Sequence, residues 1–133
     1  MAGHTLNAVQ KAIYQTLSAD STLGTLINGI FDAVPEGTAY PYIVFAGGNA
    51  ENLESLGGHR ERIRLTCEVY SRTHGRKQVQ TILDRMQILL HHASPSLDVG
   101  FQLHQIECKN ASTALLSDGL TWRGIVAVEA IVQ

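Results

Sequence analysis

The residues best suited to hold a metal ion are six histidines, and their spacing does not favour such a site. His91 and His92 are neighbours, and neighbouring helical side chains point about 100° apart, so this pair cannot easily share one ion. The other four have no cysteine or carboxylate at a spacing typical of metal ligands: His4, His59, His74 and His104. We therefore expect histidines of a surface or an interface and no metal site.

Nucleophilic and phosphate-binding chemistry also lack their usual motifs. Cys67 and Cys108 fall in strand-like patterns, which favours small core residues, with a single disulfide as the alternative. The chain has no nucleophile-elbow pattern, and no Lys-Ser/Thr pair follows Gly47-Gly48 or Gly57-Gly58 as a phosphate-binding loop would require. The sequence thus predicts a protein that is not an enzyme and has no cofactor.

Arginines form the clearest charged pattern. Arg60, Arg62 and Arg64 alternate along a strand-like segment, so they share one face at intervals of ~7 Å. Like charges at that distance repel each other unless opposite charges or solvent compensate them. Acids of a neighbouring subunit, for example within Glu51–Glu54, solvent, or DNA could do so, and we favour the neighbouring subunit. The net charge of −2 argues against tight DNA binding.

Two leucines stand out in the segment before these arginines. Residues 47–58 are rich in glycine and polar residues, which predicts a loop or a frayed hairpin tip. Leu53 and Leu56 are isolated there, and apolar residues in a polar loop commonly mark a docking surface. We therefore expect an interface formed by a set of six residues: Leu53, Glu54, Leu56, Arg60, Arg62 and Arg64.

The elements that would position these residues follow from hydrophobic periodicity. Thr5 is a plausible N-cap for a helix that ends near Ser18, and Ser21 could cap a short second helix that closes at Asn28-Gly29. Short strands are expected over 30–34 and 42–46. Pro41 stands where a strand can begin without a ladder N–H.

The second half of the chain gives stronger patterns. Apolar residues alternate over 59–71, which predicts a strand with one core face, and recur at helical spacing over 79–90. Alternation changes phase after Leu103, so a bulge is expected near His104. The last segment, 120–132, is apolar on both faces, which indicates a central or interface-covered strand.

Size and composition fit one ordinary domain over residues 1–133. The chain has 44% apolar and 17% charged residues, and no signal peptide or membrane span is visible. Charge is uneven: residues 1–58 and 78–133 are acidic, whereas residues 59–77 carry an excess of arginine. We expect an α+β fold in which an antiparallel β-sheet packs against two main α-helices.

Two segments resemble a known family. Residues 68–91, EVYSRTHGRKQVQTILDRMQILLH, join a strand end, a glycine turn and a leucine-rich helix. Residues 6–45 open with an amphipathic helix and a small second helix, then a Val-Pro turn and the strand PYIVF. This arrangement resembles the tail-completion, or tail-terminator, family of long-tailed phages and phage-derived gene-transfer particles, over about residues 5–130.

The resemblance implies a structural virion protein. Such proteins form a ring, usually of six copies, at the head-proximal end of the tail tube, in the neck of a virion or gene-transfer particle assembled in the bacterial cytoplasm. The ring ends tube polymerisation and joins the tail to the head. Its partners would be other copies of itself, the tail tube protein and the head-completion or connector protein. DNA would pass through without specific binding, and no membrane is involved.

The alternative is a protein of a different class. The same elements could form a soluble oligomeric α+β domain that binds a small ligand or a protein partner. The mass of the assembled protein in solution discriminates between the two, because only the first interpretation requires a closed ring.

Overall fold

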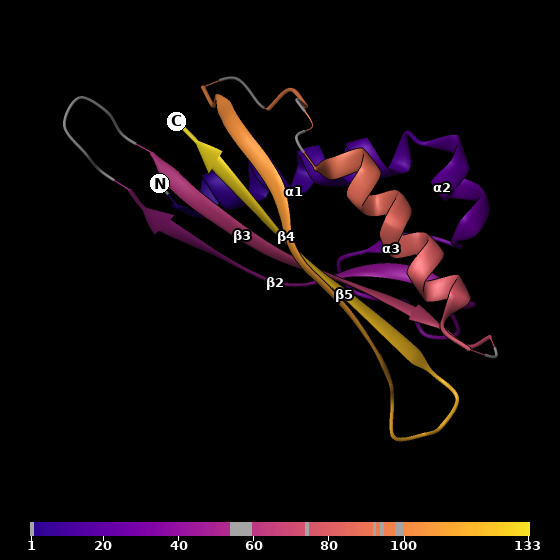
Figure 1. Ribbon diagram of the computed structural model, residues 1–133. Helices are drawn as coiled ribbons and strands as arrows, with labels where there is room; N and C mark the ends of the chain where they lie inside the picture. Colours follow the sequence, from indigo (N-terminus) through magenta and orange to yellow (C-terminus); the bar gives the residue numbers. More distant parts are fainter. Residues whose placement is uncertain (1, 54–59, 74, 92, 94, 98–99) are drawn as a thin grey trace.

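The computed structural model describes residues 2–53, 60–73, 75–91, 93, 95–97 and 100–133. Three helices and five strands follow one another along the chain (Figure 1). Their order and bounds are α1 (Ala2–Ser18), α2 (Ser21–Leu26), β1 (Ile30–Phe31), β2 (Tyr42–Asn52), β3 (Glu61–Ser71), α3 (Lys77–Leu90), β4 (Leu103–Leu115) and β5 (Trp122–Val132).

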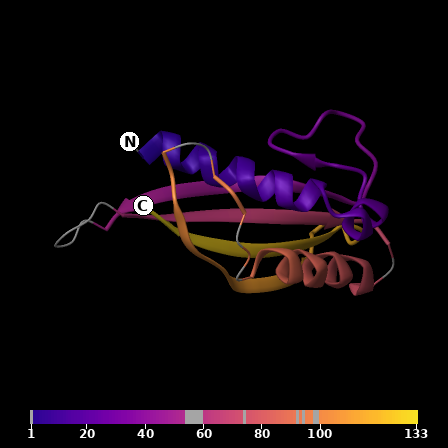
Figure 2. The same ribbon diagram turned by 90° about the horizontal axis from the view of Figure 1, so that it is seen from above.

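The strands form one five-stranded sheet in the order β1-β2-β3-β5-β4. All neighbours are antiparallel except β1 and β2, which are parallel. Seen from above, α1 runs beside β2 and β3, and α3 runs beside β5 and β4 (Figure 2). The α+β fold predicted from sequence is confirmed, and β5 lies inside the sheet between β3 and β4, as is typical of a strand that is apolar on both faces.

The core lies between the sheet and these two helices. It contains all six residues that the matched apolar stripes of β3 and α3 place together, namely Ile63, Leu65, Val69, Leu83, Met86 and Leu90. Gly124 of β5 lets α3 approach closely, because a Cβ there would lie 2.7 Å from Val79 Cγ2 and 2.9 Å from Leu83 Cδ1. Helix α3 is therefore held against the middle of the sheet.

Two helix caps differ from the sequence prediction. Helix α1 begins at Ala2, so Thr5 lies inside it, where its buried hydroxyl donates to Glu61 Oε1 over 3.1 Å. The cap of α2 is Asp20 rather than Ser21, since Asp20 Oδ2 accepts from the backbone N–H of Leu23 at 2.8 Å. The Asp20 carboxylate accepts this bond and, at the same time, two hydrogen bonds from Arg85.

The first strands also differ from expectation. Strand β1 covers only Ile30–Phe31, not 30–34, whereas β2 continues from Tyr42 to Asn52. Of the two alternatives for residues 47–58, the loop is therefore wrong as far as Asn52, whereas β2 and β3 do form a hairpin. A register shift between Phe45 and Gly47 lets the glycine-rich segment stay paired with β3. Residues 54–59 lie outside the described part of the chain.

The second half agrees more closely with the sequence. β3 alternates between buried and more exposed residues along its whole length. The pairing of β4 with β5 shifts between Leu103 and Gln105, which confirms the bulge at His104, and shifts again between Cys108 and Asn110. Cys67 is buried and Cys108 half-buried, and both are free thiols. Burial raises the pKa of Cys67 to about 12 and also raises that of Cys108.

Candidate functional site

The sheet has one face that no helix covers in the described part of the chain. Because side chains alternate along a strand, Arg62, Arg64 and Thr66 point away from the helices. The strand register places Arg64 between Asn49 of β2 and Glu129 of β5. We call this surface the open face, and it contains the arginine stripe that the sequence singled out.

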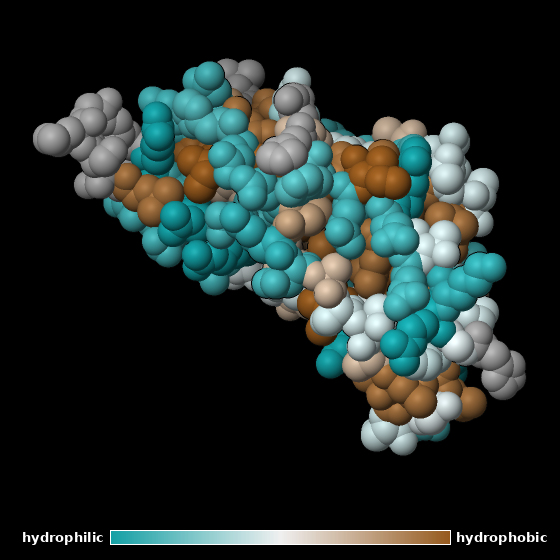
Figure 3. Space-filling view, in the orientation of Figure 1, coloured by the Kyte–Doolittle hydropathy of each residue, from teal (hydrophilic) through white to brown (hydrophobic). Residues whose placement is uncertain are grey.

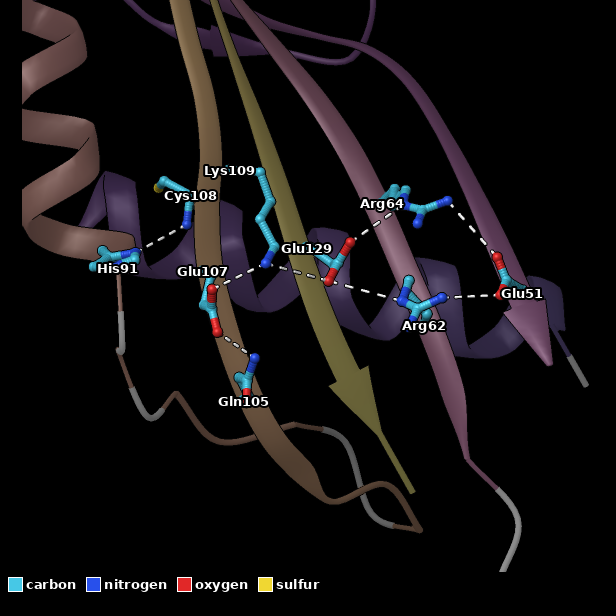
Figure 4. Close-up of polar contacts among 9 residues, drawn as sticks. All are labelled: Glu51, Arg62, Arg64, His91, Gln105, Glu107, Cys108, Lys109 and Glu129. Atoms are coloured by element: carbon cyan, nitrogen blue, oxygen red, sulfur yellow. Dashed lines mark hydrogen bonds and ion pairs between the residues drawn. The ribbon is translucent and has the colours of Figure 1, made fainter. Parts of the chain in front are cut away.

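Two arginines and two glutamates meet on the open face (Figure 4). Glu51 accepts from Arg62 Nη1 at 2.9 Å and lies 3.7 Å from Arg64 Nη1. On the other side, Glu129 lies 3.2 Å from Arg64 Nε and 3.7 Å from Arg62 Nε. Each arginine of β3 therefore lies between a carboxylate of β2 and a carboxylate of β5.

Lys109 of β4 extends the network of ion pairs to that strand. Its Nζ lies 3.1 Å from Glu107 Oε2 and 3.8 Å from Glu129 Oε1, so the ion pairs run without interruption from β4 to β2 (Figure 4). Glu107 also accepts a hydrogen bond from Gln105. The network contains three cations and three carboxylates. It is neutral, which gives little attraction for the phosphates of DNA.

The arginines of β3 are paired within their own chain, which weakens the case for a subunit contact there. Arg62 and Arg64 already have carboxylate partners in their own chain, so they do not require acids of a neighbouring subunit. Arg64, Glu51 and Lys109 are each about half exposed, whereas Arg62 is 29% and Glu129 only 16% exposed. An exposed pair such as Arg64–Glu51 contributes about 0.2–1 kcal/mol at most. The more covered pairs of Glu129 therefore hold the centre of the network, and the exposed pairs mainly set the pattern of charge on the open face.

The remaining predicted interface residues surround this network. Arg60 is exposed, and its carbonyl oxygen accepts from the backbone N–H of Leu53 at 2.7 Å, which ties the ends of β2 and β3 together. Leu53 is half-buried. Glu54 and Leu56 lie outside the described residues. That these six residues form an interface stays a prediction.

Sequence reasoning missed Glu129 and Lys109 as members of this site. Glu129 is the only charged residue between Gly124 and Val132, so its presence in an apolar strand was the available signal. Its partner could not be found without the strand order, because β3 and β5 are far apart in sequence and become neighbours only in the sheet. Lys109 lies at the second bulge of β4, between Cys108 and Asn110, and alternation alone does not locate this bulge.

A groove of about 480 Å³ lies across the middle of the open face. Small residues line its floor, since Gly47, Thr66, Ala127 and Asn110 occupy one row of the sheet. Arg64, Lys109 and Glu129 border it. Its volume is within the range of about 300–1,000 Å³ that is usual for ligand pockets, but charged side chains border it, whereas such pockets are lined mainly by apolar groups.

Aromatic side chains occupy the other end of the open face. Tyr42 lies between Tyr40 and Tyr70, with ring centroids 5.1 and 5.6 Å away, and the guanidinium of Arg72 lies 4.4 Å from the Tyr40 centroid. Burial, together with a hydrogen bond to Tyr40, raises the pKa of Tyr42 to about 12. Burial also raises the pKa of Tyr70, so Tyr42 and Tyr70 are neutral at physiological pH and act as packing groups.

The β4–β5 hairpin extends beyond the helices and ends in an apolar patch (Figures 1 and 3). Leu115 and Leu120 are 49% and 63% exposed there. Asp118 holds the turn, because its carboxylate accepts from the Thr121 hydroxyl and from the backbone N–H groups of Leu120 and Thr121. These hydrogen bonds lower the pKa of Asp118 to about 2. The patch is thus displayed on an ordered hairpin.

Neither a metal site nor a membrane helix is found in the part of the chain that the structure describes. No group of three or more His, Cys, Asp or Glu residues there is arranged to hold an ion. His59, His74 and His92 lie outside it. None of its helices is long and apolar enough to cross a membrane.

Comparisons with known proteins agree with the fold. The family model for tail completion protein gp17 matches residues 11–133. A chain of the virion of a native gene transfer agent particle is similar in structure, with a TM-score of 0.86, 23% identity and 95% of each chain covered. The gp17 protein of bacteriophage SPP1 is similar with a TM-score of 0.64 and 24% identity, covering 95% of this chain and 89% of that one. No curated protein matches the chain. The chain belongs to the tail completion protein gp17 family.

Proposed function

We propose that this member of the tail completion family forms a closed ring, of six copies, at the head-proximal end of a tail tube. The ring ends tube polymerisation and joins the tail to the head connector. The observation that carries this proposal is the family match over residues 11–133, supported by the likeness to a chain of an assembled gene transfer agent virion.

The mechanism is occlusion of a growing end. A tube grows because each ring presents the surface onto which the next ring adds. Growth stops when a different protein binds this surface and exposes an outer surface to which the next tube ring cannot bind. The fold supplies several surfaces for such contacts: the neutral open face, the helical layer, and the apolar tip of the β4–β5 hairpin. Its partners are the tail tube protein, the head-completion or connector protein, and other copies of itself.

The same chemistry supports a passive role toward DNA and no catalysis. DNA passes through the ring without specific binding, because the arginines on the open face are paired with carboxylates and the chain carries a net charge of −2. The protein acts in the neck of a virion or gene-transfer particle, after assembly in the bacterial cytoplasm. It works by binding protein surfaces and has no enzymatic activity.

Tube growth in the presence of the purified chain tests the proposal. Tail tube protein polymerised alone is expected to give tubes of widely varying length, whereas adding the chain during growth should shorten them and cap one end. The measurement is tube length and end appearance by negative-stain electron microscopy. An equal amount of the chain added after growth is complete serves as the control for breakage of finished tubes.

An unchanged length distribution, with no density added at the tube ends, would contradict the proposed role. In that case the alternative of an oligomeric binding domain would have to be reconsidered. The charged border of the groove on the open face does not favour a small apolar ligand there.

A further inference from the structure

Both edges of the sheet carry a stretch of unpaired strand in the described part of the chain. On one side β1 pairs only with Ile43 and Val44, so residues 46–51 of β2 form a free edge. On the other side β4 is the last strand. The N–H of Cys108 donates to His91 Nδ1 at 3.1 Å, which covers the start of β4 and leaves residues 110–115 free. We call these stretches the β2 edge and the β4 edge.

The β4 edge lacks the features that normally keep sheet edges apart. Natural edges are protected by charged residues, prolines or bulges, because their free N–H and C=O groups otherwise pair with another strand. The β4 edge reads Asn-Ala-Ser-Thr-Ala-Leu, without charge or proline, and its bulge lies before it, between Cys108 and Asn110. An unprotected edge of this length indicates a strand of another molecule as its partner.

We propose that the β4 edge of one copy pairs, antiparallel, with the β2 edge of the next copy, so that one continuous sheet runs around the ring. This inference rests on the proposed ring and names the contact that closes it. Because the two edges are different surfaces on opposite sides of the sheet, the contact is heterologous. A heterologous contact repeats from copy to copy and closes into a ring when its rotation allows.

Strand directions favour this partner. Strands alternate in direction from β2 through β3 and β5 to β4, so a following β2 continues the antiparallel order. Both edges are six residues long. Aligning them end to end places Ser112 opposite Asn49 of the next copy, and both of these residues belong to the open face. The pairing thus keeps the open face on one side throughout the ring.

Side-chain size and charge favour the same alignment. A groove of about 260 Å³ separates the β4 edge from α3 and is lined by Leu83, Asp84 and Ala111, among others. Gly48 and Ala50 of the next copy would lie opposite Thr113 and Ala111 on the side of this groove, and neither carries a long side chain that would clash there. On the open face, Glu51 of the next copy would lie beside Lys109. The Gly-rich β2 edge therefore fits the surface that the β4 edge offers.

Cysteine cross-linking across the proposed contact tests it. The double variant N49C/S112C places one thiol on each edge, and directly opposite residues of paired strands have Cβ atoms about 4.5–5.5 Å apart. Within one chain these two residues are separated by β3 and β5, so they lie at least roughly 14 Å apart and cannot form a disulfide. Oxidation of the assembled variant should give a ladder of dimers, trimers and larger covalent species on denaturing gels.

Single variants and the native chain provide the controls. N49C or S112C alone has one edge thiol, so neither can give covalent species beyond a dimer through that thiol. The native cysteines react slowly, since burial raises the pKa of Cys67 to about 12 and also raises that of Cys108. Oxidation of the wild type measures any remaining background.

A second variant tests the contact without cross-linking. A111E puts a charged side chain into the groove beside Asp84 and should raise the concentration needed for ring formation about tenfold or more, because the charge becomes buried without a partner. S117E adds the same charge in the exposed turn after the β4 edge and should assemble like the wild type. Circular dichroism checks that both variants are folded.

The outcomes separate this inference from the proposed function. Rings of the double variant that give no covalent ladder, or A111E rings as stable as those of the wild type, would overturn the edge pairing while leaving the ring itself intact. If the wild type forms no ring, either alone or on added tail tubes, the proposed function fails and the edge pairing fails with it.

Discussion

Asp20 shows how one carboxylate joins two helices. It caps α2 and also accepts two hydrogen bonds from Arg85 of α3, at 2.9 Å from Nε and 2.7 Å from Nη2. The Arg85 hydrogen bonds, with the backbone bond from Leu23, lower the pKa of Asp20 from 3.8 to about 2. The folded state therefore favours the ionised carboxylate.

This shift predicts how stability depends on pH. Because the pKa of Asp20 is lower in the folded state, its contribution is fully present above about pH 4 and is lost as pH falls toward 2. D20N should be less stable than the wild type at pH 7, and the difference between them should shrink between pH 4 and 2. Urea unfolding over a pH series measures both curves, with D32N as the control for removing a surface carboxylate. A difference that stays constant down to pH 2 would contradict the role assigned to Asp20.

Gly124 fixes the distance between β5 and α3. A methyl group there would meet Val79 and Leu83 at less than 3 Å, so G124A should lower the free energy of unfolding by about 1–3 kcal/mol. G47A is the matched control, because a Cβ at Gly47 meets no atom within 4 Å. Chemical denaturation of both variants tests this, and equal stability of the two would show that α3 can move aside without cost.

At the residue scale, sequence patterns predicted the positions of the helices better than the residues that cap them. Ser21 and Asp20 are both good capping residues, and the choice between them depends on Arg85, which is distant in sequence. Threonine is a residue type that often caps helices, yet Thr5 lies inside α1 and its hydroxyl donates to the buried Glu61. The preference of single residue types for cap positions could not predict either cap. In both helices the residue concerned bonds to a side chain that is distant in sequence: Thr5 to Glu61 and Asp20 to Arg85.

At the element scale, β2 marks the limit of reading strands from alternation. Its second half, Gly-Gly-Asn-Ala-Glu-Asn, has the composition of a loop but forms a strand, because β3 supplies a complete set of backbone partners beyond the bulge after Phe45. Strand β3, by contrast, alternates strictly between core and open face and was predicted correctly. The sequence therefore located the arginines and named Glu51 as a possible partner, but it assigned Glu51 to a neighbouring subunit and did not find Glu129.

The charge network of the open face gives a prediction about assembly. The double change R62E/R64E would leave Glu51 and Glu129 beside two new carboxylates. We expect the fold to survive, with the free energy of unfolding lower by about 1–2 kcal/mol, because each ion pair that is lost contributes little on its own. Ring formation should weaken at low salt and recover partly as salt screens the repulsion. Light scattering and circular dichroism over a salt series measure both effects.

The control for this variant changes the same charge elsewhere. R76E/K77E alters two cations at the start of α3, away from the open face. It should assemble like the wild type if the open face is a contact surface. Equal assembly of R62E/R64E and the wild type at low salt would remove the arginines from the assembly surface. Intact rings that no longer join heads to tails would instead identify the tube or the connector as their partner.

At the scale of the whole molecule, the order of elements carried more information than any motif. The sequence of helix, short strands, long strand, helix and two final strands was sufficient to predict the α+β fold and the resemblance to tail completion proteins, and the family match confirms the latter. The strand order could not be predicted, because β5 inserts between β3 and β4. The free sheet edges depend on that strand order, so they could not be predicted from the sequence either.

The measurement that tests the central claim most directly is an image reconstruction of the neck of the particle that contains this chain. The account predicts a closed ring of copies of this fold, six in number, between the last ring of the tail tube and the head connector. Within the ring, the β4 edge of each copy should lie against the β2 edge of the next. A neck whose density is fully explained by other proteins, or copies of this fold found elsewhere in the particle, would contradict the account.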